Sequence, residues 1–291
     1  MRRDLKKALK MILVILGLII LFVIADVIIS YKCLTVTDYK IQSAKMKEDM
    51  KIILISDLHD GKFGGNNQRL IQKIKEQHPD LILMDGDMIN EESKDPSVAT
   101  NLVKELTKSV PVYYSLGNHE LGYLKRKTSD LTKQLKKSGA IVLDKEWQDI
   151  RIKNNDLRIG GLYDYAFELE GKLSKKDKRY RTRKFLTSFE DTKNFKIMMA
   201  HRPDSFIFNQ AADTWKIDLV ASGHAHGGQV IIPGKGGLYG ADHGWFPKYV
   251  DGIHHFKTVK NMIITRGLGS DKEKLPRFNN TPEIVVINLK K

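Results

Sequence analysis

The sequence is poor in cysteine, with Cys33 as the only one among 291 residues. A single cysteine excludes an intramolecular disulfide and a zinc–thiolate cluster, and it says little about the redox compartment. The chain also lacks internal repeats and low-complexity tracts. With 41% hydrophobic and 29% charged residues, the composition is that of an ordinary globular protein. The length suffices for one large α/β domain and requires no second one.

Polar residues are nearly absent from one stretch near the N-terminus. The run MILVILGLIILFVIADVIIS, residues 11–30, follows the basic start MRRDLKKALK and contains one acid, Asp26. About 20 apolar residues are enough to span the hydrocarbon core of a bilayer. A buried helix of a soluble protein would rarely lack a polar face. We therefore predict that residues 1–31 form a basic cytoplasmic tail and a transmembrane anchor.

Export signals are the alternatives for this segment. A signal peptide cleaved at VIA, before Asp26, would have an apolar region of about 7–15 residues, and this one is longer. Arg2 and Arg3 also fit a twin-arginine signal, although the residues that flank them match that signal poorly. The positive-inside rule places residues 1–10 in the cytoplasm and the following domain outside, which predicts a single-pass cell-membrane protein. Four lysines after the span weaken that asymmetry: Lys32, Lys40, Lys45 and Lys47.

Basic residues exceed acidic ones by 49 to 35, which gives a formal net charge of +14. Such a surplus indicates either a solvated lysine-rich surface or attraction to anionic lipids and polyanions. The densest stretch is KLSKKDKRYRTRKF, residues 172–185. No nucleic-acid motif accompanies it, so nucleic acid is not the expected partner. In an anchored domain we expect a patch that faces the membrane or the substrate.

After a polar linker at residues 32–49, strand and helix patterns alternate. Expected strands at 50–57, 80–87 and 111–118 are separated by expected helices at 67–78 and 96–110, and a third helix is capped by Ser129 and ends at Gly139. This order implies parallel strands with helices packed outside. From residue 139 onward strand patterns predominate, which predicts a second sheet packed on the first.

Polar side chains gather where the expected strands end. In a mostly parallel sheet these ends share one edge, where ligands bind. Carboxylate, amide oxygen and imidazole are ligands of divalent cations, and seven of them are too many for one ion but suit two that share a carboxylate. The stretch GHAHGGQ, residues 223–229, adds two histidines that would face the same side if the segment were extended. Eight polar residues stand at these strand ends, and all of them except His119 make up the seven possible ligands. They are Asp57, His59, Asp87, Asn118, His119, His201, His224 and His226.

Five short motifs occur in a fixed order: DLH, GDMIN, GNHE, AHRP and GHAH. In this respect the sequence resembles the calcineurin-like metallophosphoesterases over about residues 50–289, so that residues 50–291 are expected to form that domain. The resemblance implies a four-layer α/β/β/α sandwich of two mixed sheets. The anchor, GHAHGGQV, GWFPKY and RGLG are similar to the membrane-associated bacterial branch. The sequence departs from the family motif G-D-x-x-D at Asn90, which puts a supporting contact in doubt rather than a ligand.

The resemblance also implies a site with two divalent metal ions, manganese being our choice over iron or zinc. Carried over by position, one ion is held by Asp57, His59, Asp87 and His226. The other is held by Asp87, Asn118, His201 and His224, so that Asp87 bridges. A hydroxide between the ions would attack phosphorus in line, with His119 as general acid or transition-state donor. Asp85 or Glu120 is expected to orient a histidine, although Glu120 suits a solvated surface equally well.

The expected activity is hydrolysis of a phosphodiester or of a lipid-linked or nucleotide diphosphate. One alternative is a cytoplasm-facing pyrophosphatase of the UDP-diacylglucosamine type, and another is a noncatalytic, metal-stabilised module that binds lipid or nucleic acid. His119 beside a full ligand set favours catalysis. If the strands that flank residues 172–185 end at the metal edge, that basic stretch is expected to overhang the site as a lid or to dock on the membrane.

Overall fold

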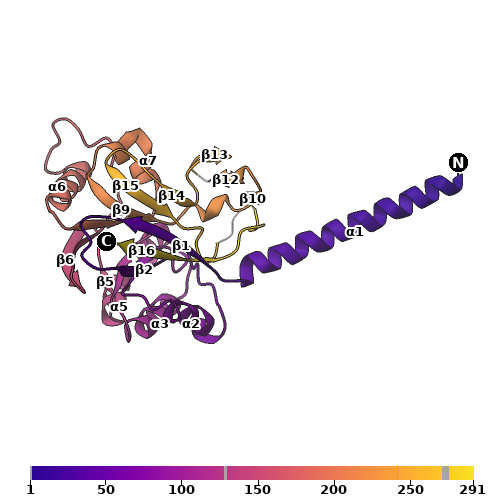
Figure 1. Cartoon of the computed structure of the whole chain (residues 1–291), viewed down its shortest axis with the longest axis horizontal. Coiled ribbons are helices and arrows are strands. Elements are labelled where there is room, and N and C mark those ends of the chain that lie inside the picture. Colours follow the sequence, from indigo (N-terminus) through magenta and orange to yellow (C-terminus); the bar gives the residue numbers. More distant parts are fainter. Residues whose placement is uncertain (1, 128–129, 241, 271–274) are drawn as a thin grey trace.

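Two six-stranded mixed sheets pack face to face in a computed structural model that describes residues 2–127, 130–240, 242–270 and 275–291 (Figure 1). Helices cover the outer face of each sheet, and one long helix projects from the domain. The predicted four-layer α/β/β/α sandwich preceded by an apolar helix is therefore confirmed. Ser129, expected to cap a helix, lies outside the described residues.

The first and last strands along the chain are the longest and lie next to each other at one side of the first sheet. In spatial order the first sheet holds β1 (Thr35–Gln42), β16 (Glu283–Lys290), β2 (Met50–Ile55), β3 (Leu81–Asp85), β4 (Val112–Ser115) and β5 (Ile141–Val142). The second holds β14 (Gly252–His254), β15 (Val259–Ile264), β9 (Ile217–Ser222), β8 (Phe195–Met199), β7 (Asn155–Gly161) and β6 (Glu146–Ile152). Two small hairpins pair β10 (Ile231–Ile232) with β11 (Gly236–Gly237), and β12 (Tyr239–Gly240) with β13 (Gly244–Trp245).

Apolar residues run without a break along the central strands because both faces of each sheet are covered. In β2, Ile53 and Ile55 pack toward the helices, whereas Ile52 and Leu54 pack against the second sheet. This alternation follows from the two-residue period of a strand. Burial of each such side chain contributes roughly 1.5–3 kcal/mol to stability. The core between the sheets therefore fixes how the two sets of strand ends face each other.

The helices of the globular part divide between the two outer faces. Helices of the first half cover the first sheet: α2 (Gln68–Lys75), α3 (Ser97–Leu106), α4 (Asn118–Lys127) and α5 (Leu131–Lys137). Helices of the second half cover the second sheet: α6 (Lys178–Glu190) and α7 (Asp204–Ile207). Single 3₁₀ turns form η1 (Gly65–Asn67), η2 (Phe208–Asp213) and η3 (His226–Gly228). Helix α4 had no counterpart in the sequence prediction.

Residues 32–49, expected to be a polar linker, contribute a strand to the first sheet instead. Strand β1 pairs in parallel with β16 along its whole length, from Thr35 beside Glu283 to Gln42 beside Lys290. Its outer position leaves most of its side chains partly exposed, and for this reason the segment has the composition of a polar connector. The globular domain thus begins at about Thr35, and the linker prediction is wrong for residues 35–42.

Helix α1 (Arg2–Lys32) has 31 residues and is long and apolar enough to cross a membrane, properties that a signal sequence shares. Its last turns contact the globular domain. Asp26 and Ser30 accept hydrogen bonds from the backbone N–H groups of Asn279 and Asn280. The Tyr31 hydroxyl accepts one from the N–H of Arg277 at 3.3 Å. The helix is therefore joined to the domain by specific polar contacts.

The basic stretch 172–185 lies far from that helix. Its second half is the start of α6, which buries Phe185, Leu186 and Phe189 against the second sheet. Figure 1 shows α6 and α1 at opposite ends of the domain. A helix held by three large apolar side chains cannot swing across the molecule, so this position disfavours docking on a membrane that α1 spans. Docking on the membrane and the function as a lid both stay predictions.

Truncation tests the contacts of α1 with the domain. Deletion of residues 1–31 removes three hydrogen bonds to segment 277–280, whereas deletion of residues 1–21 leaves them in place. At about 0.5–1.5 kcal/mol for each bond, the longer deletion is expected to lower the free energy of unfolding by about 2–4 kcal/mol relative to the shorter one. Thermal unfolding of both forms measures the difference. Both forms are expected to hydrolyse small esters, and equal stability would contradict the docking contacts.

Candidate metal centre

The residues predicted to bind metal come from both sheets and meet at one edge. Asp57 and Asp87 follow β2 and β3, while Asn118 and His119 open α4 directly after β4. His201 follows β8, and His224 and His226 follow β9. Because these strands run parallel within each sheet and the sheets pack face to face, their carboxyl ends converge. Asp57, His59, Asp87, His201 and His226 are all buried there.

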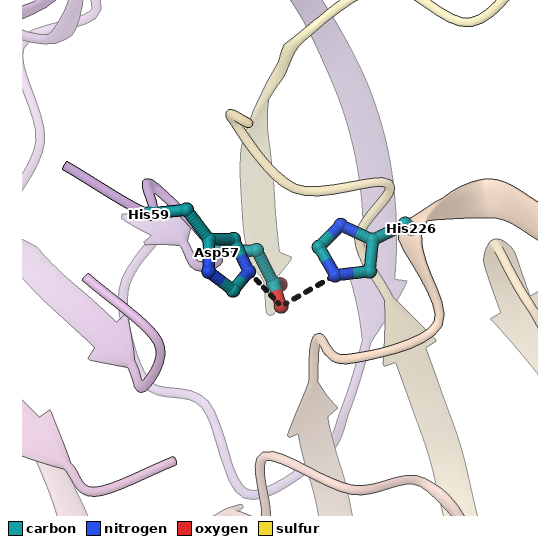
Figure 2. Close-up of side chains that lie close together, drawn as sticks. All are labelled: Asp57, His59 and His226. Carbon is teal, nitrogen blue, oxygen red and sulfur yellow. Dashed lines mark ion pairs between the residues drawn. The ribbon is translucent and has the colours of Figure 1, made fainter. Parts of the chain in front are cut away.

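One group of possible ligands consists of Asp57, His59 and His226, shown in Figure 2. The Nε2 atoms of His59 and His226 lie 3.9 Å and 3.7 Å from Asp57 Oδ1. The two rings flank the carboxylate, and their Nε2 atoms point toward its oxygen. Ligand atoms within 4.8 Å of one another are close enough to contact a single cation.

A second group consists of Asp87, His201 and His224. His201 Nε2 lies 3.0 Å from Asp87 Oδ2 and 3.8 Å from Asp57 Oδ1, so this ring stands between the two carboxylates. Asp87 also groups with His59 of the first set. The two sets are therefore adjacent, and Asp87 is placed where it can serve both.

The backbone at this edge is strained. Among the seven predicted ligands, five have positive φ: Asp57, His59, Asp87, His224 and His226. Non-glycine residues in this region cost of order 1 kcal/mol each and gather at functional sites, where the surrounding structure holds them. This geometry also overturns one expectation. The segment from His224 to His226 is not extended, since β9 ends at Ser222 and both histidines take left-handed turns.

Two glycines allow the loops to approach the carboxylates closely. A Cβ atom on Gly117 would lie 2.1 Å from Asp87 Oδ1, and one on Gly223 would lie 2.3 Å from Asp57 Oδ2. Carbon and oxygen atoms that are not bonded to each other never come so close. The glycines of GNHE and GHAH are therefore required to seat the carboxylates against the neighbouring backbone.

Three histidines are held so that Nε2 is left with a lone pair. The Nδ1 of His201 faces the carbonyl of Asp85 at 2.6 Å, and that of His226 faces the carbonyl of Gly269 at 3.0 Å. A carbonyl oxygen only accepts, so Nδ1 must carry the proton in both rings. His59 Nδ1 likewise lies 2.8 Å from Asn90 Oδ1. Metal-binding histidines are oriented in this way by a second partner.

The polar atoms at the centre of the cluster fit a cation. His59 Nε2 and Asn118 Oδ1 are buried with no hydrogen-bond partner. Burial works to raise the pKa of Asp57, but His226 and His201 outweigh it and the pKa is lowered, so that the carboxylate stays charged. Anionic oxygens and neutral imidazoles suit a divalent metal ion.

His119 has the opposite tautomer. The backbone N–H of Glu91 donates to its Nδ1 at 3.3 Å, so in the neutral ring the proton sits on Nε2. By distance alone His119 groups with His59 and Asp87, because its Nε2 lies 4.0 Å from Asp87 Oδ2. A protonated Nε2 has no lone pair for a metal. It is instead a hydrogen-bond donor directed at the cluster, and its side chain is partly exposed.

The two residues expected to support the site do so in different ways. Glu120 is fully buried, and its carboxylate accepts from the N–H groups of Asp87, Met88 and Gly117. It therefore fixes the turn that carries Asp87, and the alternative of a solvated Glu120 is wrong. Asp85 orients His201 through its backbone carbonyl rather than its carboxylate.

Sequence reasoning missed a polar group beside His224. Asp242 accepts a hydrogen bond from His224 Nε2 at 2.9 Å and forms an ion pair with Arg202 at 2.7 Å. Nδ1 is thus the nitrogen of His224 that remains for the cluster. Asn280 was also missed, although its side-chain amide donates to the carbonyl of His226 at 2.7 Å. Neither residue belongs to a recognisable motif, and only the folded loops bring them to the site.

Comparison with known proteins identifies the domain. The family model described as calcineurin-like phosphoesterase matches residues 50–228, which is more than half of the chain. The chain belongs to the calcineurin-like phosphoesterase family. It is therefore a hydrolase of phosphoric esters, as the sequence analysis predicted.

The relatives differ in how much of their length is shared. A metallophosphoesterase of Campylobacter jejuni is 27% identical over 252 residues, which covers 86% of this chain but 62% of the relative. The phosphodiesterase YaeI of Escherichia coli is 27% identical over 243 residues, 82% of each chain. A 5'-nucleotidase precursor from Thermus thermophilus has the same fold with a TM-score of 0.50 at 13% identity, over 75% of this chain and 48% of its own.

Substitution of Glu120 tests whether its hydrogen bonds stabilise the turn that carries Asp87. In Glu120→Gln, an amide N–H₂ replaces one of two oxygens that accept from three backbone N–H groups and the Tyr114 hydroxyl. Leaving buried donors unpaired costs about 1–3 kcal/mol each, so we expect a loss of about 2–5 kcal/mol in the free energy of unfolding. Denaturant titration measures it. Glu105→Gln, which breaks only an exposed pair with Lys108, is the control and should change stability little.

Asn90 stands where the family motif has an acid, and its amide oxygen accepts from His59. Asn90→Leu removes that acceptor, and loss of such a contact typically lowers metal affinity about 10- to 100-fold. Asn90→Asp restores an acceptor and should bind metal at least as tightly as the original chain. Competition with a fluorescent chelator measures both affinities. Equal affinity in the leucine variant would show that the hydrogen bond does not orient His59.

Proposed function

We propose that this protein is a membrane-anchored phosphodiesterase that uses two divalent metal ions. The observation that carries the proposal is the pair of adjacent ligand groups with Asp87 between them. Asp57, His59, Asp87 and His226 would hold one ion, and Asp87, Asn118, His201 and His224 the other. Manganese is the proposed metal because oxygen and nitrogen ligands suit it, with iron or zinc as the other choices.

Two bound cations would lower the pKa of a water molecule and polarise the phosphoryl oxygens. The chain supplies the remaining functions. Because the Nε2–H of His119 points at the cluster, His119 is placed to donate a hydrogen bond or a proton to the leaving oxygen. Glu120 and the close glycine contacts keep both carboxylates fixed while negative charge develops on the phosphoryl oxygens.

The natural substrate is proposed to be a phosphodiester or diphosphate at or near the lipid surface. Tethering gives no advantage against a small soluble ester, whereas it raises the effective concentration of a substrate held in the same membrane. The name of one relative, the phosphodiesterase YaeI of Escherichia coli, agrees with a diester. We propose that the domain lies outside the cytoplasm, and protease protection of full-length protein in intact cells tests that orientation.

The activity is tested on purified full-length protein loaded with manganese. We expect hydrolysis of a chromogenic phosphodiester in preference to the matching monoester, loss of activity with EDTA, and recovery on adding manganese. Metal analysis should give two ions for each chain. A protein that binds metal and hydrolyses neither ester would be a noncatalytic, metal-stabilised module.

Substitutions of His119 and Asp87 are expected to impair the protein in different ways. His119→Ala should lower kcat by roughly 10²- to 10⁴-fold while metal content stays nearly intact, because that ring is a donor. Asp87→Ala should lose metal as well, since both groups include that carboxylate. Activity and metal content are measured on the same preparations. If both variants lost metal equally, His119 would be a ligand and its assignment here would be wrong.

A further inference from the structure

We propose that the aromatic pair Trp245 and Phe246, at the open end of the β12–β13 hairpin, inserts into the surface of the bilayer that holds α1. The partner is the lipid bilayer itself, at the level of its headgroups. This inference rests on the proposed anchoring of the chain and extends it from the helix to the globular domain. The active centre would then be held against the membrane by two separate elements.

The two aromatic side chains are unusually exposed. Outside α1, the large apolar residues that the structure describes as exposed are Trp147, Tyr165, Trp245 and Phe246. Trp245 and Phe246 are 66% and 53% exposed, against 37% and 40% for the other two. Trp245 rests edge-on against Tyr239 of the paired strand, and this leaves its outer face free. Adjacent exposed aromatics mark an interaction surface, and tryptophan is enriched where proteins meet headgroups.

A continuous series of contacts joins these residues to α1. Phe22 of α1 packs edge-on against Phe278, and Phe278 bridges to Val230 beside β10. The carbonyl of Val230 accepts from the N–H of Leu238, and the carbonyl of Leu238 accepts from the N–H of Phe246. The segments lie side by side from the helix to Phe246 at the open end of the β12–β13 hairpin. Figure 1 shows β10, β12 and β13 at the end of the domain from which α1 emerges.

The position of these contacts along α1 sets the level of the membrane. No charged residue occurs from Met11 to Ala25, and Asp26 is the first acid after that run. Phe22 lies inside the apolar run and already touches Phe278, while Asp26 one turn later bonds to Asn279. The bilayer surface therefore meets α1 beside residues 278–279. Elements packed on that segment lie at headgroup level.

Charge and position agree with an anionic lipid surface. Lys235 is exposed between β10 and β11, and Lys248 is exposed shortly after β13. Basic residues near a membrane surface are attracted to anionic lipids. The hairpin that ends in Trp245 also carries Asp242, which holds Nε2 of His224. Insertion of Trp245 and Phe246 would thus fix the hairpin whose turn supports one ligand group.

The test measures depth in the bilayer and does not depend on activity. In a Cys33→Ser background, Phe246→Cys or Trp245→Cys receives a nitroxide label, and Lys175→Cys on the stretch at the opposite end of the domain is the matched control. Full-length protein is placed in vesicles of phosphatidylglycerol and phosphatidylethanolamine. We expect labels at 245 and 246 to collide more with oxygen than with a water-soluble nickel chelate, and the label at 175 to show the reverse.

Two results would overturn the proposal. One is water exposure at 245 and 246 equal to that at 175. The other is strong dipolar broadening between labels at 246 in sparsely loaded vesicles, which would identify a second copy of the chain as the partner of the hairpin.

A second measurement separates this inference from the proposed function. Trp245→Ser with Phe246→Ser should leave turnover of a small chromogenic diester unchanged and reduce turnover of a phospholipid with a chromogenic headgroup in vesicles. Equal turnover of the lipid by both proteins would contradict a functional insertion. If the unaltered protein hydrolysed neither substrate, the proposed function would fail, while the depth measurement would still decide the membrane contact.

Discussion

Two carboxylates, Asp57 and Asp87, lie side by side almost without contact to water, and the rest of the site compensates for that arrangement. Isolated buried charges are expensive unless cations or hydrogen-bond donors surround them. Here the N–H of His224 donates to Asp57, the N–H of His119 donates to Asp87, and imidazoles surround both. Two buried negative charges need positive charge beside them, and this makes the edge suitable for metal ions.

The same constraint explains the unusual backbone. A turn that directs a carboxylate into the cluster must not clash with the neighbouring loop. Left-handed backbone conformations at the ligand residues, with glycines in the neighbouring loop, meet both requirements. The strain is held by partners that contact no ligand atom, Glu120 above all, because it bonds the turn of Asp87 to the start of α4. Stability and ligand geometry therefore depend on the same few hydrogen bonds.

The sequence allowed the sandwich, the strand ends and the polar residues that meet at them to be predicted, since apolar periodicity and short motifs are local properties. Strand β1 was missed because its polar side chains face solvent, while its pairing with β16 depends on residues 246 positions away, as for Thr37 and Glu283. Asp242 and Asn280 escaped for a similar reason: their contacts with the histidine loop exist only after distant segments fold together. The tautomers of the histidines could be assigned only from the carbonyl groups of neighbouring loops, which the sequence does not place.

The pairing of β1 with β16 has a consequence for biogenesis. Strand β1 follows α1 and is made early, and its only hydrogen-bonded neighbour among the described strands is β16. Until β16 leaves the ribosome, β1 presents an unpaired edge. Closing so long a loop is slow because entropy is lost before any contact is gained. The first sheet can therefore be completed only once β16 has been made, and until then the edge of β1 is open to pairing with other chains.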